Sequence, residues 1–308
     1  MIIHEKEQYD FYGLVLDFTM ATHDTYPVII SLNSMDRVVV RVPLDTIVEK
    51  GKIYHIVGTG EQYKTKIHIY TKEFKLLNDI DNLTQEEKDE ITNKILGNTL
   101  IDTKAVINYL DEKVSSIENK VLKDITENIL LRYKTKFIEY PAATKFHHAY
   151  KSGLLYHTYN CLRLALSYTK IYSNINTDLI ISGVILHDIM KIKEIKAFEN
   201  EYSIEGKLIG HVSLSSQEIE KTAYMLGYDG QEEVLLLKHI VLSHHENPEY
   251  GSPKRPQILE ALIIHLADMA DAKIQPTIEA LERAKIGELT EPIYVNERDK
   301  FYKHKLTK

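Results

Sequence analysis

The stretch that most constrains the fold is residues 179–195, LIISGVILHDIMKIKEI, where a strongly apolar run ends in ionisable groups. Apolar residues fill nearly every face from Leu179 to Leu186, so we expect a helix buried in the middle of a helical domain. His187, Asp188 and Lys191 arrive together at its end. An imidazole beside a carboxylate offers a nitrogen and an oxygen ligand to a divalent cation, and a carboxylate can bridge two ions. A hydrogen-bonded His-Asp pair that caps the helix is the alternative.

The length and composition indicate a globular protein with a sizeable core. With 308 residues, of which 44% are hydrophobic, the chain can form one large domain or two smaller ones. No apolar run approaches the roughly 18 to 20 residues that a membrane span needs, and the first residues, MIIHEKEQYD, lack the order of a secretory signal. We therefore expect a cytoplasmic protein without membrane contact. The single cysteine, Cys161, cannot form an internal disulfide and is expected in the core, which fits a reducing compartment.

The charge and the histidine content set further limits on function. The formal charge of −7 argues against a protein that coats nucleic acid by bulk electrostatics, although it leaves room for a local basic groove. There are 14 histidines and no tryptophan, and most of the histidines lie between residues 147 and 265. Since imidazole is a common metal ligand, the placement of these histidines decides whether the bias is functional.

Residues 9–77 are predicted to form a small β module. Five runs of β-branched or aromatic residues are separated by breaks such as His23-Asp24 and Gly51. Strands at this spacing favour a small barrel like the oligonucleotide/oligosaccharide-binding fold (OB-like) over residues 1–77. In that fold, residues 44–50 would form a short helix between the third and fourth strands.

A barrel of this kind commonly binds a nucleic acid strand. Bases stack on surface aromatic rings beside basic side chains. The alternative is that the tyrosines pack the barrel and the lysines only solvate edge strands. The charges in this segment are roughly balanced, so a basic surface is weakly indicated. The candidates for contact with a strand are Tyr54, Tyr63, Tyr70, Lys64, Lys66 and Arg41.

From Asn78 onward the composition becomes charged and helical. Thr84 is a plausible helix N-cap, and Glu86 and Glu87 after it suit the positive end of a helix. Apolar residues continue at helical spacing beyond it. We expect residues 78–140 to form a helical connector that packs onto a second domain.

Residues 141–284 are predicted to be all helical, because successive segments carry apolar residues at i, i+3, i+4 spacing with turn residues between them. A helical bundle with a site built from facing helices is the natural interpretation. Several buried, unpaired imidazoles and carboxylates would each cost stability, so their recurrence on successive helices indicates a metal site. The metal-competent side chains at helix ends or within apolar faces are His157, His187, Asp188, His211, His244, His245 and Asp268.

The order of these residues resembles a known family. His157, then His187-Asp188, then Asp268 is similar to the pattern of the HD-domain metal-dependent phosphohydrolases. PAATKFHHAYKSGLLYHT, GVILHDIMK and LSHHENPEYGSPKRP resemble one branch, the YhaM-type 3'-5' exoribonucleases of Gram-positive bacteria. That branch joins an N-terminal OB-like domain to an HD domain. The resemblance implies an HD domain over residues 141–284 and extends into the C-terminal tail, residues 285–308.

The resemblance also implies a set of metal ligands. One divalent ion is implied at His157, His187, Asp188 and Asp268. A second ion, bridged by Asp188, is implied by the match to three further histidines of HD proteins, His211, His244 and His245. The last two can both ligate only if their helix ends there, as Asn247-Pro248 suggests. Nitrogen and oxygen donors without a thiolate suit manganese or a similar first-row ion better than a structural zinc.

Other residues near these ligands have expected roles. Lys191 lies one helical turn after the His-Asp pair, matches the lysine of the family's HDxxK pattern, and would neutralise phosphate charge. We expect Lys191 and Asp188 to be catalytic. Met190 stands where many relatives have glycine, which removes no ligand. Asp271, one turn beyond Asp268, is a candidate for orienting a histidine, with a surface salt bridge as the alternative. The candidate substrate contacts, for which a turn or cap is an equally good explanation, are His148, Ser252, Lys254 and Arg255.

The chemistry follows from the charges of such a site. Two close cations lower the pKa of a bridging water and stabilise the phosphoryl oxygens during in-line displacement. The expected function is hydrolysis of single-stranded RNA from its 3' end with one or two Mn²⁺ ions, and single-stranded DNA is an open second substrate. A second hypothesis is an HD phosphohydrolase of a cyclic dinucleotide or a nucleoside triphosphate. A third is a non-catalytic nucleic-acid-binding protein. Assembly into a homo-oligomer is compatible with the family.

Overall fold

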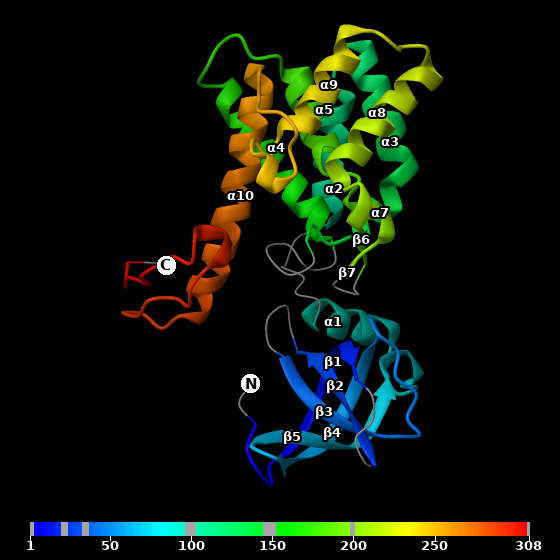
Figure 1. Cartoon of the computed structure of the whole chain (residues 1–308), viewed down its shortest axis with the longest axis vertical. Helices are drawn as coiled ribbons and strands as arrows, with labels where there is room; N and C mark the ends of the chain where they lie inside the picture. The colour runs from blue at the N-terminus through cyan, green and yellow to red at the C-terminus, as the bar shows by residue number, and fades with distance from the viewer. Residues whose placement is uncertain are drawn as a thin grey trace. The chain divides into compact units, whose positions relative to one another are not determined.

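The computed structural model describes residues 3–19, 24–32, 37–95, 103–143, 152–197 and 201–306. The chain divides into two compact units, a β-rich unit within Met1–Ile101 and a helical unit formed by Asp102–Ala197 and Glu201–Lys308 (Figure 1). The described ranges contain no helix that combines the length and the apolar character needed to cross a membrane. The boundaries at residues 77, 140 and 284 remain predictions.

The first unit is a closed five-stranded barrel, which confirms the predicted OB-like module. Its strands follow the order β1-β2-β3-β5-β4, and β4 pairs again with β1. The pairing is parallel between β3 and β5 and antiparallel elsewhere in the barrel. The strands are β1 (Gln8–Phe18), β2 (Thr25–Ser31), β3 (Arg37–Pro43), β4 (Ile53–Tyr63) and β5 (Lys66–Leu76).

The barrel interior is filled by alternating residues of these strands. Val15, Ile30, Val40 and Ile56 are fully buried in one apolar cluster, as expected when successive side chains point to opposite faces of a strand. Gly13 allows β1 to lie close to β2, because a Cβ atom there would be 2.2 Å from a methyl carbon of Ile30. The sequence pattern therefore determines both the closure and the packing of the barrel.

One local prediction in the barrel is wrong. Residues 44–50 form turns and irregular backbone, where a short helix was expected. Two tyrosines explain the difference. The Tyr26 hydroxyl donates to the carbonyl of Thr46 at 2.6 Å, and the Tyr54 hydroxyl accepts from the backbone N–H of Glu49 at 3.0 Å. These side chains satisfy backbone groups that a helix would have paired internally.

Helix α1 (Gln85–Ile95) belongs to the barrel unit. It follows the short 3₁₀ turn η1 (Leu77–Asp79). Thr84 and Glu87 form a capping box, in which the Glu87 N–H donates to the Thr84 hydroxyl at 3.2 Å and the Thr84 N–H donates to the Glu87 carboxylate at 2.8 Å. Ile95 packs with Leu14 of β1 in a second apolar cluster. The first helix of the predicted connector therefore packs on the barrel.

The second unit is a helical bundle, as predicted. A two-stranded hairpin and short helices interrupt the longer helices, which lie side by side in Figure 1. Its elements are α2 (Thr103–Ser115), α3 (Lys120–Glu139), α4 (Gly153–Thr169), α5 (Thr177–His187), α6 (Lys191–Glu194), β6 (Ile195–Lys196), β7 (Glu201–Tyr202), α7 (Ile204–Leu208), α8 (His211–Leu226), α9 (Glu232–Ser243), η2 (Pro248–Tyr250), α10 (Leu259–Arg283) and η3 (Tyr294–Asn296).

Helix α5 is the centre of this bundle. Every residue from Leu179 to His187 is buried, and the helix packs against α3, α4, α9 and α10. Asn176 caps its start by accepting from the N–H of Leu179 at 3.0 Å. Gly183 permits close approach of the neighbouring helices, because a Cβ atom there would lie 2.6 Å from Ile264. The apolar run thus holds the His-Asp pair in the interior.

The segment after α10 returns alongside that helix. Leu289 and Ile293 form β-bridges to Tyr302 and Asp299. The Asn296 amide donates to the Thr277 hydroxyl at 2.7 Å, which ties the segment to α10. The C-terminal tail is therefore part of the helical unit.

Candidate metal centre

Two histidines stand at the carboxyl ends of helices in the same way. His187 is the last residue of α5, and its Nδ1 donates to the carbonyl of Val184 at 2.6 Å. His244 follows the last residue of α9, and its Nδ1 donates to the carbonyl of Val241 at 2.8 Å. Carbonyls in the last turn of a helix lack intrahelical partners, so they fix these rings locally. Each ring is left with its Nε2 facing the interior.

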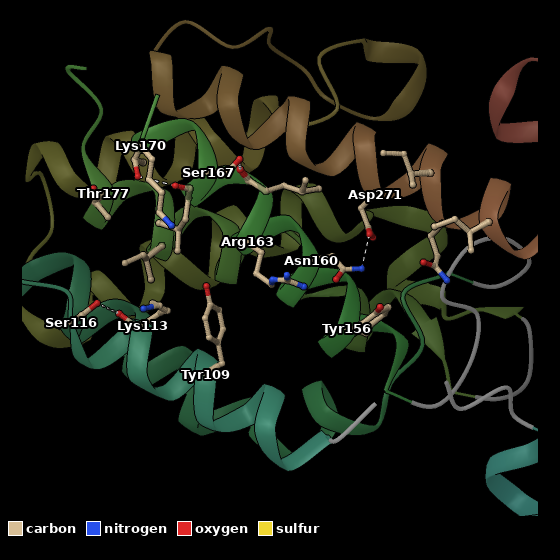
Figure 2. Close-up of a pocket in the computed structure, with 17 residues that line it drawn as sticks. Tyr109, Lys113, Ser116, Tyr156, Asn160, Arg163, Ser167, Lys170, Thr177 and Asp271 are labelled. Carbon is tan, nitrogen blue, oxygen red and sulfur yellow. Dashed lines mark hydrogen bonds between the residues drawn. The ribbon is translucent and has the colours of Figure 1, made fainter. Parts of the chain in front are cut away.

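His157 on α4 is held by a carboxylate instead. Its Nδ1 lies 2.7 Å from Asp271, whose other oxygen accepts from the Asn160 amide at 2.8 Å (Figure 2). Its Nε2 lies 3.4 Å from Asp188 and 3.2 Å from Asp268. A carboxylate bonded to the outer nitrogen of a histidine orients the ring and raises its basicity as a ligand. Asp271 thus has the contact expected of a residue that orients a histidine.

His211 is fixed at the start of α8 by Glu194. One carboxylate oxygen accepts from the His211 backbone N–H at 3.0 Å, and the other lies 2.9 Å from its Nδ1. The first N–H groups of a helix need such an acceptor, and a negative charge there is favoured by the helix dipole. Glu194 therefore caps α8 and points the His211 Nε2 toward Asp188, 3.2 Å away.

Asp188 lies between two groups of histidines. Its Oδ2 is 3.4 Å from the Nε2 atoms of both His157 and His187. Its Oδ1 is 3.2 Å from the Nε2 of His211 and 3.6 Å from that of His244. Two donors that are each about 2.1 Å from one ion stand roughly 3 to 3.5 Å apart, so these separations suit shared coordination. Each carboxylate oxygen thus faces a different pair of imidazoles.

The remaining two predicted ligands complete this arrangement. His245 Nδ1 lies 3.6 Å from Asp268, and its Nε2 lies 3.2 Å from the Nε2 of His211. Helix α9 ends at Ser243, as the sequence predicts, so His244 and His245 both reach the cluster. The Ser252 hydroxyl accepts from the backbone N–H of His245 at 3.0 Å. This bond places Ser252 in the loop that supports His245.

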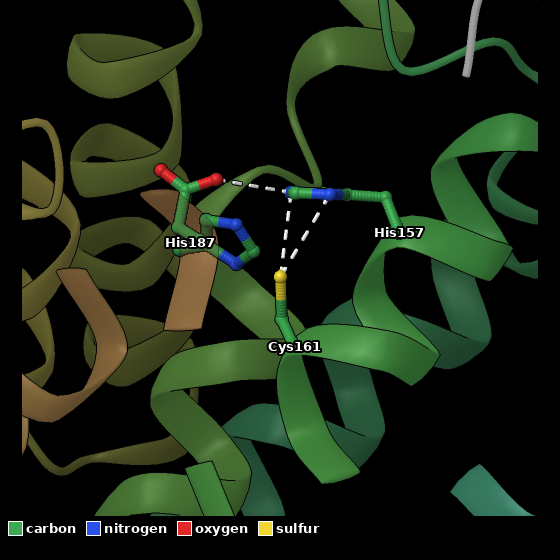
Figure 3. A group of neighbouring side chains, drawn as sticks. His157, Cys161 and His187 are labelled. Atoms are coloured by element: carbon green, nitrogen blue, oxygen red, sulfur yellow. Dashed lines mark hydrogen bonds and ion pairs between the residues drawn. The ribbon is translucent and has the colours of Figure 1, made fainter. Parts of the chain in front are cut away.

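Cys161 lies behind His157, one turn further along α4. Its sulfur is 3.6 Å from Nε2 and 3.7 Å from Nδ1 of the imidazole, as Figure 3 shows. Together with His157, His187 and Asp268 it forms a group whose donor atoms lie within 4.8 Å of one another. Burial raises the pKa of this thiol to about 12. In the metal-free protein Cys161 is therefore a neutral core residue at physiological pH.

Lys191 supplies the positive charge of the cluster. Its ammonium lies 2.6 Å from Asp188 Oδ2, and the side chain is only 12% exposed. Burial alone would lower the pKa of Lys191, but the charges of Asp188 and Asp268 raise it above its ordinary value. The lysine is therefore charged and faces the same interior as the carboxylates.

The electrostatics keep the carboxylates ionised and several imidazoles neutral. Burial by itself raises the pKa of Asp188, but Lys191 and the neighbouring histidines bring it well below its usual range. Burial lowers the pKa of His187 to about 4 and that of His245 to about 2. The pKa of His211 is raised to about 9, because the nearby carboxylates of Asp188 and Glu194 outweigh its burial. Ionised carboxylates and neutral imidazoles are the forms that bind metals.

Three buried atoms indicate that the cluster accommodates a cation. His187 Nε2, Asp188 Oδ1 and His244 Nε2 have no hydrogen-bond partner among the described residues. Such atoms are costly to bury in a folded protein unless a ligand satisfies them. His187 belongs to one group of close potential ligands, and Asp188 and His244 belong to the other. The residues therefore fit a divalent ion.

Not every predicted residue joins this cluster. Lys254 and Arg255 are exposed in the loop before α10, and His148 lies outside the described residues. In the barrel, Tyr54 is buried and stacks on Phe74. Arg41 is also buried, with its guanidinium 2.9 Å from the Thr25 hydroxyl. Tyr54 therefore packs the barrel interior, which was the alternative to contact with a strand. Arg41 is covered on the opposite face of β3 from Val40 and Val42, so neither side chain is exposed to a strand.

Three residues of the site were missed by the sequence analysis. Glu194 orients His211, Asn160 bonds Asp271, and His265 donates from Nδ1 to the carbonyl of His244 at 2.7 Å. Asn160 has a recognisable signal, since it follows His157 by three residues on one helix face. Glu194 has no such signal, because its partner His211 is distant from it in the sequence.

Comparison with known proteins identifies the family. Residues 154–273 match the HD domain family, which accounts for the described histidine and aspartate cluster and implies binding of divalent metal ions. The 3'-5' exoribonuclease YhaM of Bacillus licheniformis is 40% identical over 252 residues, covering 82% of this chain and 78% of that protein. The proteins of the same name from Bacillus subtilis and a Geobacillus species are each 37% identical over 252 residues, again 82% of this chain, and cover 78% and 75% of their own lengths. The chain therefore belongs to the family of YhaM 3'-5' exoribonucleases.

Proposed function

We propose that this protein is a metal-dependent hydrolase that removes nucleotides from the 3' end of single-stranded RNA. The observation that carries the proposal is the position of Asp188, whose two oxygens face different pairs of imidazoles at 3.2 to 3.6 Å. One carboxylate between two groups of nitrogen donors suits a bridging ligand of a two-ion site. The relatives named as 3'-5' exoribonucleases supply the substrate class.

The ligands fall into two groups around Asp188. We assign His157, His187 and Asp268 to one ion and His211, His244 and His245 to the other. The donors assigned here are nitrogen and oxygen atoms. This set favours Mn²⁺ or a similar first-row ion.

The reaction needs a nucleophile and stabilisation of the phosphoryl charge. When bound, a pair of divalent ions supplies a water that ionises near neutral pH and neutralises the phosphoryl oxygens. The chain's own contribution is positional. Glu194 and Asp271 fix the rings of His211 and His157, and the Lys191 ammonium adds positive charge beside Asp188. Water adds to the phosphorus atom, and the bond between this phosphorus and the O3' of the preceding nucleotide breaks. The products are a nucleoside 5'-monophosphate and a strand that is one nucleotide shorter.

The barrel is proposed to hold the RNA strand. Lys64 and Lys66 are exposed at the turn between β4 and β5, and Tyr63 and Tyr70 are partly exposed beside them. Aromatic rings beside cations form the kind of surface that binds single strands. Single-stranded DNA as a second substrate, a homo-oligomeric state and a cytoplasmic location remain predictions.

The proposal is tested with the full-length protein, Mn²⁺ and a 5'-labelled single-stranded RNA. We expect a ladder that shortens from the 3' end, no ladder with Asp188→Ala, and an unchanged ladder with Asp229→Ala, which removes an exposed carboxylate. A single-stranded DNA of the same sequence and a cyclic dinucleotide are run in parallel. Intact RNA beside a hydrolysed dinucleotide would assign the site to small nucleotides, and inactivity on every substrate would refute the hydrolase.

A further inference from the structure

A groove runs along the outer side of α4, away from the metal ligands. Its volume is about 760 Å³, and α2, α4, α5 and α10 of the helical unit line it. Asn160, Arg163 and Ser167 follow one another along one face of α4, and Lys170 follows its last residue (Figure 2). Pockets for small ligands commonly have volumes of 300 to 1,000 Å³, so the groove has the size to hold one.

The two ends of the groove differ in charge. Lys113 and Lys170 lie together at one end with the hydroxyls of Ser116, Ser167 and Thr177, as Figure 2 shows. Asp271 is at the other end. Cations bind phosphate oxygens, whereas a carboxylate repels them. The hydroxyls of Ser116 and Ser167 donate to the backbone carbonyls of Lys113 and Leu164, so the lysines carry the attraction. A phosphorylated ligand would therefore bind with its phosphate at the Lys113–Lys170 end.

Aromatic rings hold two of the groove's cations in place. The Lys113 ammonium lies 5.2 Å from the centre of the Tyr109 ring, and the Arg163 guanidinium lies 5.2 Å from that of Tyr159. Lys113 is also paired with Glu112 at 3.0 Å. Among the described residues neither Arg163 nor Lys170 has an ion-pair partner. Both are exposed cations and are available to an anion.

The remaining wall of the groove is apolar. Leu164 of α4, Ile181 of α5, and Ile274 and Ile278 of α10 contribute it. A flat, weakly polar ring system packs well on such a wall, with a few polar groups to orient it. The Asn160 and Gln275 amides also line the groove, and they donate to the carboxylates of Asp271 and Glu279. The groove can therefore accommodate a phosphate at its Lys113–Lys170 end and a planar ring on its apolar wall.

The groove is separate from the metal centre. The Asp271 carboxylate stands between it and His157, which is fully buried. A nucleotide in the groove is therefore not the one whose phosphodiester bond is hydrolysed. It would instead lie against Asn160 and Asp271, which position His157 from the outer side.

We propose that this groove is a second binding site for a nucleotide, with the phosphate at the Lys113–Lys170 end, Arg163 midway along the groove and the base on the apolar wall. The choice of a nucleoside phosphate over other phosphate esters rests on the proposed function, because hydrolysis of RNA releases nucleoside monophosphates. The ligand is either a free nucleotide or a nucleotide of a bound strand. Both present the same phosphate and base.

The test is calorimetric titration of the full-length protein in EDTA, which removes hydrolysis from the experiment. The probes are adenosine 5'-monophosphate, inorganic phosphate and a single-stranded hexanucleotide. We expect one saturable site for the monophosphate or the hexanucleotide, whichever is the source. Lys170→Gln and Arg163→Gln should each weaken binding about tenfold, as expected for loss of one charge-assisted bond. Lys221→Gln, an exposed lysine on α8, should leave affinity within about twofold.

Asp188→Ala separates this site from the proposed catalytic one. Binding that survives in Asp188→Ala and weakens in Lys170→Gln and Arg163→Gln supports the groove, whether or not the protein hydrolyses RNA. Binding lost in Asp188→Ala but kept in the two groove variants would place the nucleotide at the metal centre and overturn the proposal. Absence of saturable binding by the monophosphate and the hexanucleotide, or binding of inorganic phosphate alone, would also overturn it.

Discussion

Arg41 in the barrel and Asp188 in the helical unit are both buried charged residues, but they differ in how far their hydrogen-bonding groups are satisfied by the fold. Arg41 in the barrel donates to the hydroxyl and the carbonyl of Thr25 at 2.9 and 3.1 Å, and its guanidinium lies 4.0 Å from the centre of the Tyr63 ring. Asp188 in the helical unit has an Oδ1 atom without a hydrogen bond from the described residues, and the Nε2 atoms of His187 and His244 are likewise unsatisfied. Both side chains are at most 2% exposed.

The difference teaches how to separate structure from function in a buried cluster. A buried charge whose hydrogen bonds are complete within the fold stabilises the fold. A buried cluster of ligating atoms that lack hydrogen bonds destabilises the fold, so its presence indicates that a ligand binds there. Arg41 belongs to the first kind and Asp188 to the second. The variants below act on one kind or the other.

The largest effect is expected from Asp188→Asn. The substitution keeps the volume but removes the negative charge that faces both groups of imidazoles. Metal ions contribute several kcal/mol to stabilising the transition state, so we expect RNA hydrolysis to fall on the order of a thousandfold. Single-turnover kinetics and the manganese content after dialysis check this result. Activity within tenfold of the parent would show that Asp188 is not a ligand.

A smaller loss is expected from Asp271→Ala. The His157 ring would lose the acceptor that now lies 2.7 Å from its Nδ1. Removal of a carboxylate that orients a ligand commonly costs 10- to 100-fold in metal affinity or activity. Manganese titration measures the effect, and Asn160→Ala, which leaves the carboxylate in place, should cost less. Equal affinities in Asp271→Ala and the parent would show that Asp271 serves only the fold.

The next prediction concerns pH. In the metal-free protein the pKa of His211 is raised from its ordinary value of 6.5 to about 9 by Asp188 and Glu194. The stability that this raised pKa contributes is fully present below pH 6.5 and is lost as pH rises through about 9. A metal ion must displace this proton, and also that of His157, whose pKa the nearby carboxylates raise well above 6.5 despite its burial, so affinity should rise at least about tenfold per pH unit up to pH 9. Calorimetry in buffers of different ionisation enthalpy counts the released protons, and a pH-independent affinity would contradict the prediction.

Arg41→Met is expected to lower the stability of the fold without changing metal affinity, in contrast to the variants of the metal centre. Loss of the buried hydrogen bonds to Thr25 should destabilise the barrel by about 1 to 3 kcal/mol. Metal affinity should not change, because the helical unit contains the metal ligands. Urea unfolding and manganese titration measure the two quantities on one sample. A fall in metal affinity without a fall in stability would break the contrast between the two charges.

The smallest effect is expected from Cys161→Ala. Its thiol, with a pKa raised to about 12, contacts the His157 ring but is protonated at neutral pH. We expect unchanged metal stoichiometry and activity within about threefold, together with a modest loss of packing energy. Metal analysis by mass spectrometry checks this expectation. Loss of one metal equivalent would make Cys161 a ligand.

The sequence predicted the site residues best where they lie close together along the chain. His187, Asp188 and Lys191 follow one buried helix, so their proximity could be predicted from spacing alone. The bond from Glu194 to His211 could not, because it depends on how the segment between α5 and α8 folds back. Tyr54 shows the same limit, since the side of the strand that enters the barrel interior depends on register. Convergence of distant side chains needs the tertiary fold.

The most direct test of the two-ion centre is a crystal structure with Mn²⁺, recorded at the manganese absorption edge. We predict two anomalous peaks with Asp188 between them, one beside His157, His187 and Asp268 and the other beside His211, His244 and His245. Asp229→Ala, as the matched control, should show both peaks, and Asp188→Ala should lose at least one. Absence of peaks at these histidines, or a peak that contacts none of them, would contradict the proposed metal centre.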